Sequence, residues 1–160
     1  MKKITIIGAG FVGSTAAHWI ASRNLGEVVL LDLNEGAAKG KALDLWQSMP
    51  VVNSSAKVFG TASYADTKNS DIVVITAGLP RKPGMSRDDL VKVNTEIVKK
   101  VSESAAKFSP NAIYIVVTNP LDAMVYVTWK ATKAKPHRVI VMAGILDTAR
   151  MRTFIAQALN

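Results

Sequence analysis

The glycine pattern near the start of the chain constrains the fold more than any other feature. A short apolar run, Ile4–Ile7, is followed directly by Gly8-Ala9-Gly10-Phe11-Val12-Gly13, which has the spacing G-x-G-x-x-G. Beyond the glycines, Val12, Ala16 and the pair Trp19-Ile20 recur at the helical period. A strand, a glycine-rich turn and a helix in this order predict a βα unit whose turn binds the phosphates of a dinucleotide.

Each residue of this turn has a predicted task. Gly8 permits the tight turn, Gly10 lets the backbone approach a pyrophosphate, and Gly13 lets the helix pack closely on the strand. The motif opens the helix that contains Trp19, so the unpaired N–H groups and the positive end of that helix would meet the diphosphate, and Phe11 and Val12 are predicted to bind the cofactor with the glycines.

An acidic residue at the end of the next strand supports the same ligand. The apolar run Val28–Leu31 ends at Asp32, about 20 residues beyond Gly13, where this type of fold hydrogen-bonds a ribose 2′-hydroxyl. A carboxylate there would repel a 2′-phosphate. The sequence therefore predicts NAD rather than NADP as the cofactor.

The rest of the chain continues the alternation of strands and helices. Near-continuously apolar runs, typical of parallel strands covered on both faces, follow at Val28–Leu31, weakly at Lys57–Thr61, and at Ile72–Ile75, Ile113–Val117 and Val139–Met142. Helical periodicity lies in Ala42–Met49, Leu90–Phe108 and Asp147–Leu159. We therefore expect one α/β domain over residues 1–160, a doubly wound open parallel sheet of about six strands (a Rossmann fold) with helices on both faces.

Residues that favour helix ends support the longest of these predicted helices. Ser86 followed by Asp89 has the spacing of a capping box, which begins a helix. The pair Ser109-Pro110 predicts its end.

Composition narrows the classes of partner. The net charge of +8 raises nucleic acid as a candidate, but the basic residues are dispersed, and the one cluster, Lys130–Arg138, has no interleaved aromatic side chain and fits a solvated loop. No apolar run approaches the roughly 20 residues that span a bilayer. Without cysteine there is no disulfide or thiolate metal site. We expect a cytoplasmic protein with no nucleic-acid, membrane or metal partner.

Three further motifs fall at the carboxyl ends of predicted strands, where open α/β sheets bind ligands. They are Leu79–Arg87 (LPRKPGMSR), Thr118–Asp122 (TNPLD) and Leu146–Arg150 (LDTAR). Together with the glycine turn, Asp32 and Gly40–Leu45 (GKALDL), they closely resemble the malate dehydrogenases of the lactate-dehydrogenase-like group. The resemblance extends from Lys3 to Ala156.

The resemblance implies a site for a dicarboxylic 2-oxo acid. Arg81 would hold the distal carboxylate of oxaloacetate or malate, and Arg87, on the same mobile loop, would polarise the reacting carbonyl. Arg150 would bind the other carboxylate bidentately, which suits a guanidinium group. Asn119 would hydrogen-bond substrate or cofactor. Cations at both ends and at the carbonyl oxygen also suit a dianionic substrate chemically.

The resemblance also assigns cofactor and catalytic residues. Thr76, Ala77 and Gly78 would line the dinucleotide together with Asn94. Asp147 would orient a catalytic histidine, which in the family lies in a GxHGD motif some two dozen residues beyond the LDxxR motif. The printed sequence ends ten residues after Arg150. We therefore expect the carboxyl-terminal catalytic and substrate domain to be absent.

The sequence also departs from the family pattern at its histidines and at one position of the last predicted strand. The chain's histidines are His18 and His137, and neither is expected to replace the missing base. Val141 stands where the family usually has glycine. A β-branched residue at that position suits a strand but would crowd the geometry near Asp147. The missing histidine predicts NAD(H) binding with little or no turnover. The absent half would also supply part of the substrate pocket, which predicts only weak dicarboxylate binding.

Two alternatives remain open from the sequence. One is a malate dehydrogenase whose activity is residual or depends on complementation by the missing half. The other is a basic scaffold domain with a vestigial dinucleotide site. Full-length relatives pair through the helix that corresponds to Gly36–Met49, which implies a homodimer.

Overall fold

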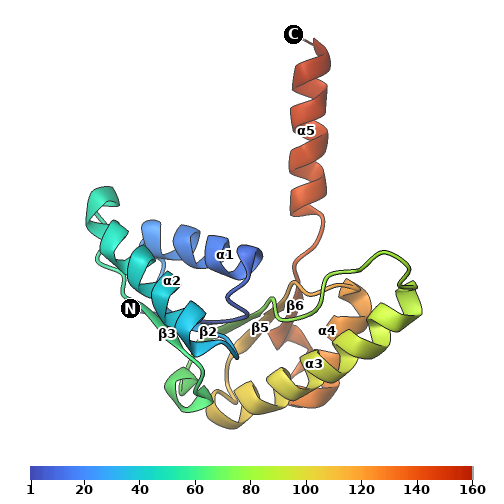
Figure 1. The fold of residues 1–160 in the computed structure, drawn as a ribbon, viewed down its shortest axis with the longest axis horizontal. Helices are drawn as coiled ribbons and strands as arrows, with labels where there is room; N and C mark the ends of the chain where they lie inside the picture. The colour runs from blue at the N-terminus through green and yellow to red at the C-terminus, as the bar shows by residue number, and fades with distance from the viewer. Residues whose placement is uncertain (160) are drawn as a thin grey trace.

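The computed structural model describes residues 1–159 and contains an all-parallel sheet of six strands (Figure 1). The strands lie in the order β3-β2-β1-β4-β5-β6. They are β1 (Lys3–Ile7), β2 (Glu27–Leu31), β3 (Val58–Thr61), β4 (Ile72–Ile75), β5 (Ile113–Val116) and β6 (Val139–Val141). The chain begins at the centre of the sheet, runs to one edge and then returns to build the other half. The predicted Rossmann fold is confirmed.

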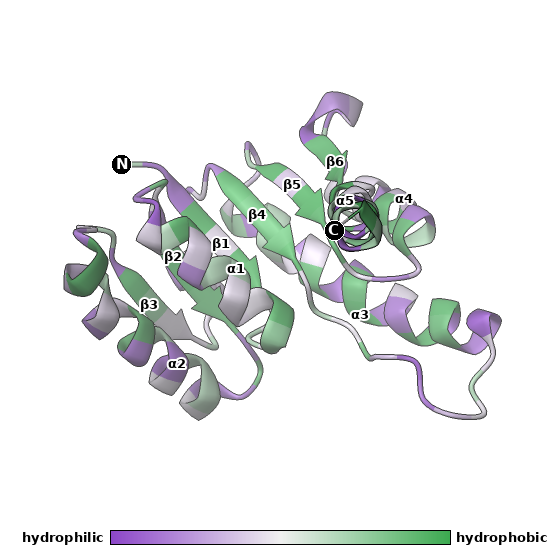
Figure 2. Ribbon diagram, turned by 90° about the horizontal axis from the view of Figure 1, so that it is seen from above, coloured by the Kyte–Doolittle hydropathy of each residue, from purple (hydrophilic) through white to green (hydrophobic). Residues whose placement is uncertain are grey.

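Helices cover both faces of this sheet. Those of the described residues are α1 (Phe11–Ser22), α2 (Glu35–Ser48), α3 (Arg87–Phe108), α4 (Leu121–Thr132) and α5 (Ile145–Leu159), with single 3-10 turns η1 (Met49–Val52), η2 (Tyr64–Thr67) and η3 (Pro136–Arg138). Figure 2 shows α1 and α2 on one side of the sheet and α3 and α4 on the other. Over residues 1–159 we find no helix with an apolar stretch long enough to cross a bilayer.

Alternate side chains of the four inner strands β2, β1, β4 and β5 enter two separate cores. One core joins Ile4 and Ile6 of β1 to buried alanines of α1 and α2. The other joins Val73 and Ile75 of β4 to Val98 of α3. Because both faces of these inner strands are covered, their sequences are near-continuous apolar runs. The small side chains of the alanines let α1 lie close to the sheet.

Helix α4 is absent from the sequence prediction. Its β-branched and aromatic residues have low intrinsic helix propensity, so packing decides its conformation. Met124 and Thr128, one turn apart, are buried against the rest of the fold. The basic cluster Lys130–Arg138 is also more ordered than the predicted loop, because its first residues complete α4 and its last three form η3.

Helix α5 stands away from the body of the molecule. Figure 1 shows it projecting from the body of the molecule after β6, on the side of the sheet that carries α1, and none of its described residues is buried. The helix predicted over Asp147–Leu159 is confirmed and begins two residues earlier. Apolar side chains such as Met151, Phe154 and Ile155 are 49–66% exposed on it. A helix of this composition is normally covered by other protein.

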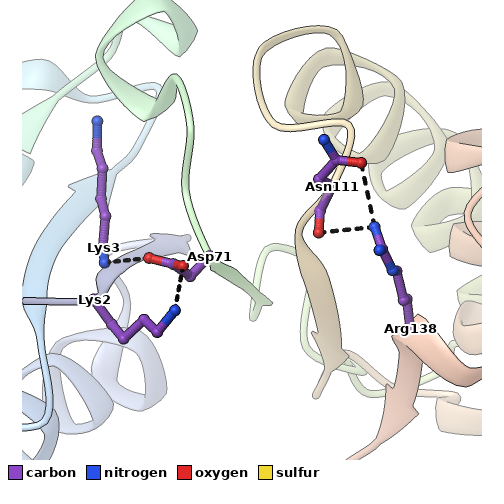
Figure 3. Close-up of polar contacts among 5 residues, drawn as sticks. All are labelled: Lys2, Lys3, Asp71, Asn111 and Arg138. Atoms are coloured by element: carbon purple, nitrogen blue, oxygen red, sulfur yellow. Dashed lines mark hydrogen bonds and ion pairs between the residues drawn. The ribbon is translucent and has the colours of Figure 1, made fainter.

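Polar contacts fix the opposite, amino-terminal edge of the sheet (Figure 3). The Asp71 carboxylate accepts a hydrogen bond from Lys2 Nζ at 2.8 Å and another from the Lys3 backbone N–H at 2.9 Å. Both bonds lower the pKa of Asp71, and the bond from Lys2 has the larger effect. Arg138 Nη1 donates to the backbone oxygen of Asn111 at 3.0 Å. These contacts occupy basic residues far from the glycine turn.

The predicted capping box at the start of α3 is present. The Ser86 hydroxyl accepts from the Asp89 N–H at 3.1 Å and donates to the Asp89 carboxylate at 2.6 Å, and the Ser86 N–H donates to the same carboxylate. These bonds lower the pKa of Asp89, the hydroxyl donation having the largest effect. The box holds the first turn of α3 next to the loop that carries Arg81.

We expect Ser86→Ala to raise the pKa of Asp89 toward its ordinary value, because the alanine donates no hydroxyl hydrogen bond to the carboxylate. The measurement is an NMR titration of the Asp89 carboxyl carbon. The wild-type cap stabilises the helix above the unfolded pKa of about 3.9 and loses its effect as the pH falls through the lower folded value. Ser104→Ala on the same helix is the control. An Asp89 pKa equal in all three proteins would contradict the capping account.

Candidate functional site

The glycine turn between β1 and α1 is shaped by contacts at Gly8 and Gly13. Gly8 has a φ of +109°, which favours glycine, and its N–H donates to the Leu31 oxygen at 2.8 Å. A Cβ at Gly13 would lie 1.8 Å from the Gly8 oxygen, so α1 packs directly on the turn. A Cβ at Gly10 would meet nothing within 4 Å. The backbone conformation at Gly8 and the close packing at Gly13 thus require glycine, while Gly10 borders open space.

Asp32 ties this turn to the start of α2. One oxygen of its carboxylate accepts from the Ala9 N–H at 2.7 Å, and the other accepts from the Asn34 N–H at 3.0 Å. The carboxylate is half-buried at the end of β2. Its remaining lone pairs are available to a ligand, because each carboxylate oxygen can accept more than one hydrogen bond.

Two adjoining hollows lie on either side of the glycine turn. The Asn119 hollow, of about 510 Å³, reaches from the turn to Arg81 and Asn119. The Asp32 hollow, of about 370 Å³, reaches from the turn to Asp32 and Tyr64. Both are lined by Gly10, Thr76, Gly78 and Leu79, so they meet at the turn. A ligand with two lobes joined by a phosphate linker fits this arrangement.

Every residue predicted to bind the cofactor lines one of these hollows. The Asn119 hollow has Gly10, Phe11, Val12, Gly13, Thr76, Gly78, Asn94 and Asn119 on its walls. The Asp32 hollow adds Gly8, Asp32 and Ala77. Their contacts with a cofactor stay predictions, but the fold brings them together.

Asn94 connects the two loops at the floor of the Asn119 hollow. Its side chain is 1% exposed, and its carbonyl oxygen accepts from the Leu79 N–H at 2.8 Å. Its amide group donates to the Leu79 oxygen at 3.2 Å and to the Asn119 oxygen at 2.7 Å. The side chain therefore holds the backbone that follows β4 against the backbone that follows β5.

Threonines fix the same strand ends. The Thr76 hydroxyl bonds to the Ile7 and Gly8 oxygens, each at 3.1 Å, and the Thr118 hydroxyl donates to the Ala77 oxygen at 2.8 Å. A Cβ at Gly78 would lie 2.5 Å from the Thr118 methyl carbon. Tight packing of this kind makes the wall of the hollows rigid, which suits a preformed ligand site.

The residues predicted to bind substrate are not gathered in one place. Arg81 lines the Asn119 hollow, where its Nε donates to the Met85 oxygen at 2.9 Å. Arg87 is the first, exposed residue of α3 and lines neither hollow. Asp147 and Arg150 form an ion pair at 3.4 Å on α5, with side chains 82% and 62% exposed. The structure therefore brings together all the residues predicted to bind the cofactor. Of those predicted to bind substrate, it places only Arg81 and Asn119 in a hollow.

Comparison with known proteins assigns this geometry to a family. Residues 2–141 match the family model described as lactate/malate dehydrogenase, NAD binding domain. The chain belongs to this family. The resemblance and the NAD cofactor predicted from the sequence are confirmed.

The similarity to individual relatives extends over nearly the whole of this chain. The malate dehydrogenase of Heliobacterium modesticaldum is 58% identical over 99% of this chain and 52% of that protein. The apo malate dehydrogenase structure from Picrophilus torridus gives a TM-score of 0.95 at 46% identity, over 99% of this chain and 51% of that one. The Archaeoglobus fulgidus malate dehydrogenase in complex with NADH gives 0.91 at 38% identity, over 98% and 53%. This chain therefore spans about half the length of the relatives it matches.

Sequence reasoning missed several residues of the NAD-binding domain's hollows. Tyr64 lines the Asp32 hollow from η2, and its burial raises its pKa to about 12. No motif marks this tyrosine, because a single 3-10 turn has no sequence period. Leu90 and Thr118 line the Asn119 hollow. Thr118 stands in the TNPLD motif, so its position at a strand end was the signal that could have found it.

Proposed function

We propose that this domain binds NAD(H) across the two hollows, with the adenosine half beside Asp32 and the nicotinamide half beside Asn119. The observation that carries the proposal is the junction of the hollows at the glycine turn. A pyrophosphate at that junction would lie against the start of α1, which has no acidic residue in its first turn. Gly10 leaves room there for the approach of a phosphate.

The proposed reaction class is hydride transfer between NAD(H) and a dicarboxylic 2-hydroxy or 2-oxo acid. It rests on the relatives' names and on Arg81, whose guanidinium lines the Asn119 hollow and suits a carboxylate. Bound NAD(H) supplies or accepts the hydride, and the residues of this chain would hold the ring and the substrate beside it. Because Arg87 and Arg150 lie outside the hollow, we expect weak dicarboxylate binding by the described residues alone.

We further propose little or no turnover by this chain on its own. Reduction of a ketone also needs a proton donor, most often a histidine. His18 lies on α1 with its ring 5.5 Å from that of Trp19, and His137 lies in η3 at the amino end of β6. Neither imidazole lines the hollows. An oxaloacetate-dependent oxidation of NADH at the rate of an intact malate dehydrogenase would overturn this part of the proposal.

A dehydrogenase completed by a second polypeptide is the alternative that one observation favours. Helix α5 carries Asp147 and Arg150 and leaves its apolar side chains uncovered. The test mixes this chain with the carboxyl-terminal half of a malate dehydrogenase and measures NADH oxidation by oxaloacetate. Activity that needs both polypeptides, and that Arg150→Ala removes, supports complementation. Absence of activity from the mixture argues for a domain that only binds. We also propose a cytoplasmic location for either function, with which a sequence without cysteine is compatible.

Asp32→Asn is expected to weaken NADH binding about tenfold, because the amide accepts ribose hydroxyls less strongly and turns a donor toward them. It should also narrow the preference for NADH over NADPH, because the charge that repels a 2′-phosphate is removed. Titrations that follow nicotinamide fluorescence measure both effects. Glu96→Gln, an exposed residue of α3, makes the same charge change as a control. Unchanged affinities for both cofactors in Asp32→Asn would place the adenosine half elsewhere.

Pairing through α2 is the proposed mode of any homodimer. Leu43 and Trp46 are 50% and 48% exposed on this helix. We expect a dimer of the wild-type chain that Trp46→Glu dissociates, because the partner would bury a carboxylate. Light scattering after size exclusion measures the mass. A wild-type mass of one chain, or a dimer that tolerates the substitution, contradicts this mode.

A further inference from the structure

Both backbone polar groups of Ala9, inside the glycine turn, are hydrogen-bonded. Its N–H donates to the Asp32 carboxylate at 2.7 Å. Its carbonyl oxygen accepts two hydrogen bonds, one from the Ser14 hydroxyl at 3.1 Å and one from the Lys41 ammonium group. Lys41 reaches this oxygen from α2. No residue of α2 lines either hollow, but through Lys41 the helix contacts the turn between them.

The consequence of holding the Ala9 carbonyl falls on the next residue. In a planar trans peptide, the carbonyl of one residue and the N–H of the following residue point in opposite directions. The bonds from Ser14 and Lys41 therefore direct the Gly10 N–H away from α2. Within residues 1–159 this N–H donates to no protein acceptor, and Gly10 lines both hollows. It is a donor aimed at the junction where a pyrophosphate fits.

We propose that Lys41 is a positioning residue for NAD(H), which orients the Ala9–Gly10 peptide so that the Gly10 N–H faces the cofactor's pyrophosphate. The inference rests on the NAD(H) site proposed above. Ser14 makes only a neutral hydrogen bond to the same oxygen, and a charged donor is roughly twice as strong. Lys41 thus does most to hold the peptide in this orientation.

The partners of Lys41 separate this role from an ordinary surface charge. Among the described residues Lys41 forms no ion pair, so its charge is directed at the carbonyl. Lys39, two positions earlier on α2, instead pairs with Glu35 at 2.8 Å. Lys39 carries the same charge as Lys41 and lies on the same helix, but it contacts a different group. It is therefore the matched control for any general electrostatic effect on an anionic ligand.

The test compares Lys41→Met, Lys41→Arg and Lys39→Met with the wild-type chain. Lys41→Met should weaken binding of NADH and of ADP-ribose about tenfold, since a charged hydrogen bond that orients the site is lost. The loss should be equal at low and high salt, because the effect is local rather than a screened attraction. Lys41→Arg should restore affinity to within about threefold, since a hollow of about 210 Å³ beside Lys41 accommodates the larger group. Lys39→Met should bind as the wild type does.

The Gly10 amide resonance in the ligand-free protein tests the positioning directly. It should shift in Lys41→Met, return in Lys41→Arg and stay unchanged in Lys39→Met. A Gly10 resonance that Lys41→Met does not move overturns the inference, whether or not the chain binds NADH. So does an affinity loss in Lys41→Met that disappears at high salt or that Lys39→Met reproduces. Failure of the wild-type chain to bind NADH, with the resonance behaving as expected, would count against the proposed function and not against the positioning role.

Discussion

Gly13→Ala is expected to abolish measurable NADH binding and to lower the free energy of unfolding by about 3 kcal/mol or more. The new Cβ would lie 1.8 Å from the Gly8 oxygen and 2.8 Å from the Thr76 hydroxyl. The first is a backbone atom, so the clash cannot be relieved by rotating a side chain. Either α1 moves away from β1 or the turn changes shape, and both alter the junction of the two hollows.

Gly40→Ala is the matched control, because it makes the same chemical change on α2 where a Cβ would meet nothing within 4 Å. Replacing a glycine inside a helix by alanine should stabilise the chain by about 0.5–1 kcal/mol. Urea unfolding measures both stabilities, and NADH titration measures binding. If the two variants changed stability in the same direction, the contact at Gly13 would not be the cause.

The fold was predictable because its signals are local. Each buried strand is a short apolar run. The residues predicted to bind the cofactor lie together because most of them follow the ends of parallel strands. The capping box at Ser86 and Asp89 was read from two residues and a spacing. The G-x-G-x-x-G motif likewise depends on backbone geometry that only glycine satisfies, as the contacts of Gly8 and Gly13 show. None of these inferences needs information about distant residues.

The parts that sequence reasoning missed depend on contacts between distant segments. Helix α4 has weak propensity and is held by the burial of Met124 and Thr128. The periodicity of α5 indicates apolar side chains but not what covers them, and the structure leaves Phe154 66% exposed. Lys41 occurs in a motif that the sequence analysis used only for the resemblance. Its contact with the Ala9 oxygen joins residues 32 positions apart.

Asn94 shows how a residue can be assigned to a site before its contacts are known. The family resemblance implies a place beside the cofactor, and the residue does line the Asn119 hollow. The described structure adds that both ends of its amide are bonded to backbone of the two loops. We therefore expect its first effect on NAD(H) binding to be that it holds the walls of the hollow in place.

Asn94→Ala is expected to lower the free energy of unfolding by about 2–4 kcal/mol and to weaken NADH binding by at least tenfold. The substitution removes the acceptor of the Leu79 N–H and the donor to the Asn119 oxygen, at a position that is 1% exposed. Buried backbone groups that lose their partner carry the full cost of their desolvation. The strand-end loops should then separate, and hydrogen exchange of the Leu79 amide should accelerate more than that of amides in β1.

Asn111→Ala removes an asparagine from the opposite edge of the sheet and serves as the comparison. The Asn111 side chain accepts a single long bond from Arg138 at 3.4 Å, while its backbone oxygen keeps the shorter bond at 3.0 Å (Figure 3). An exposed contact of this kind should contribute less than about 0.5 kcal/mol. We therefore expect Asn94→Ala to differ strongly from Asn111→Ala in the free energy of unfolding, in the affinity for NADH and in the rate of hydrogen exchange at the Leu79 amide. If Asn94→Ala unfolded like Asn111→Ala, the two loops would be held together by Thr118 and packing alone, and the role given to Asn94 would be wrong.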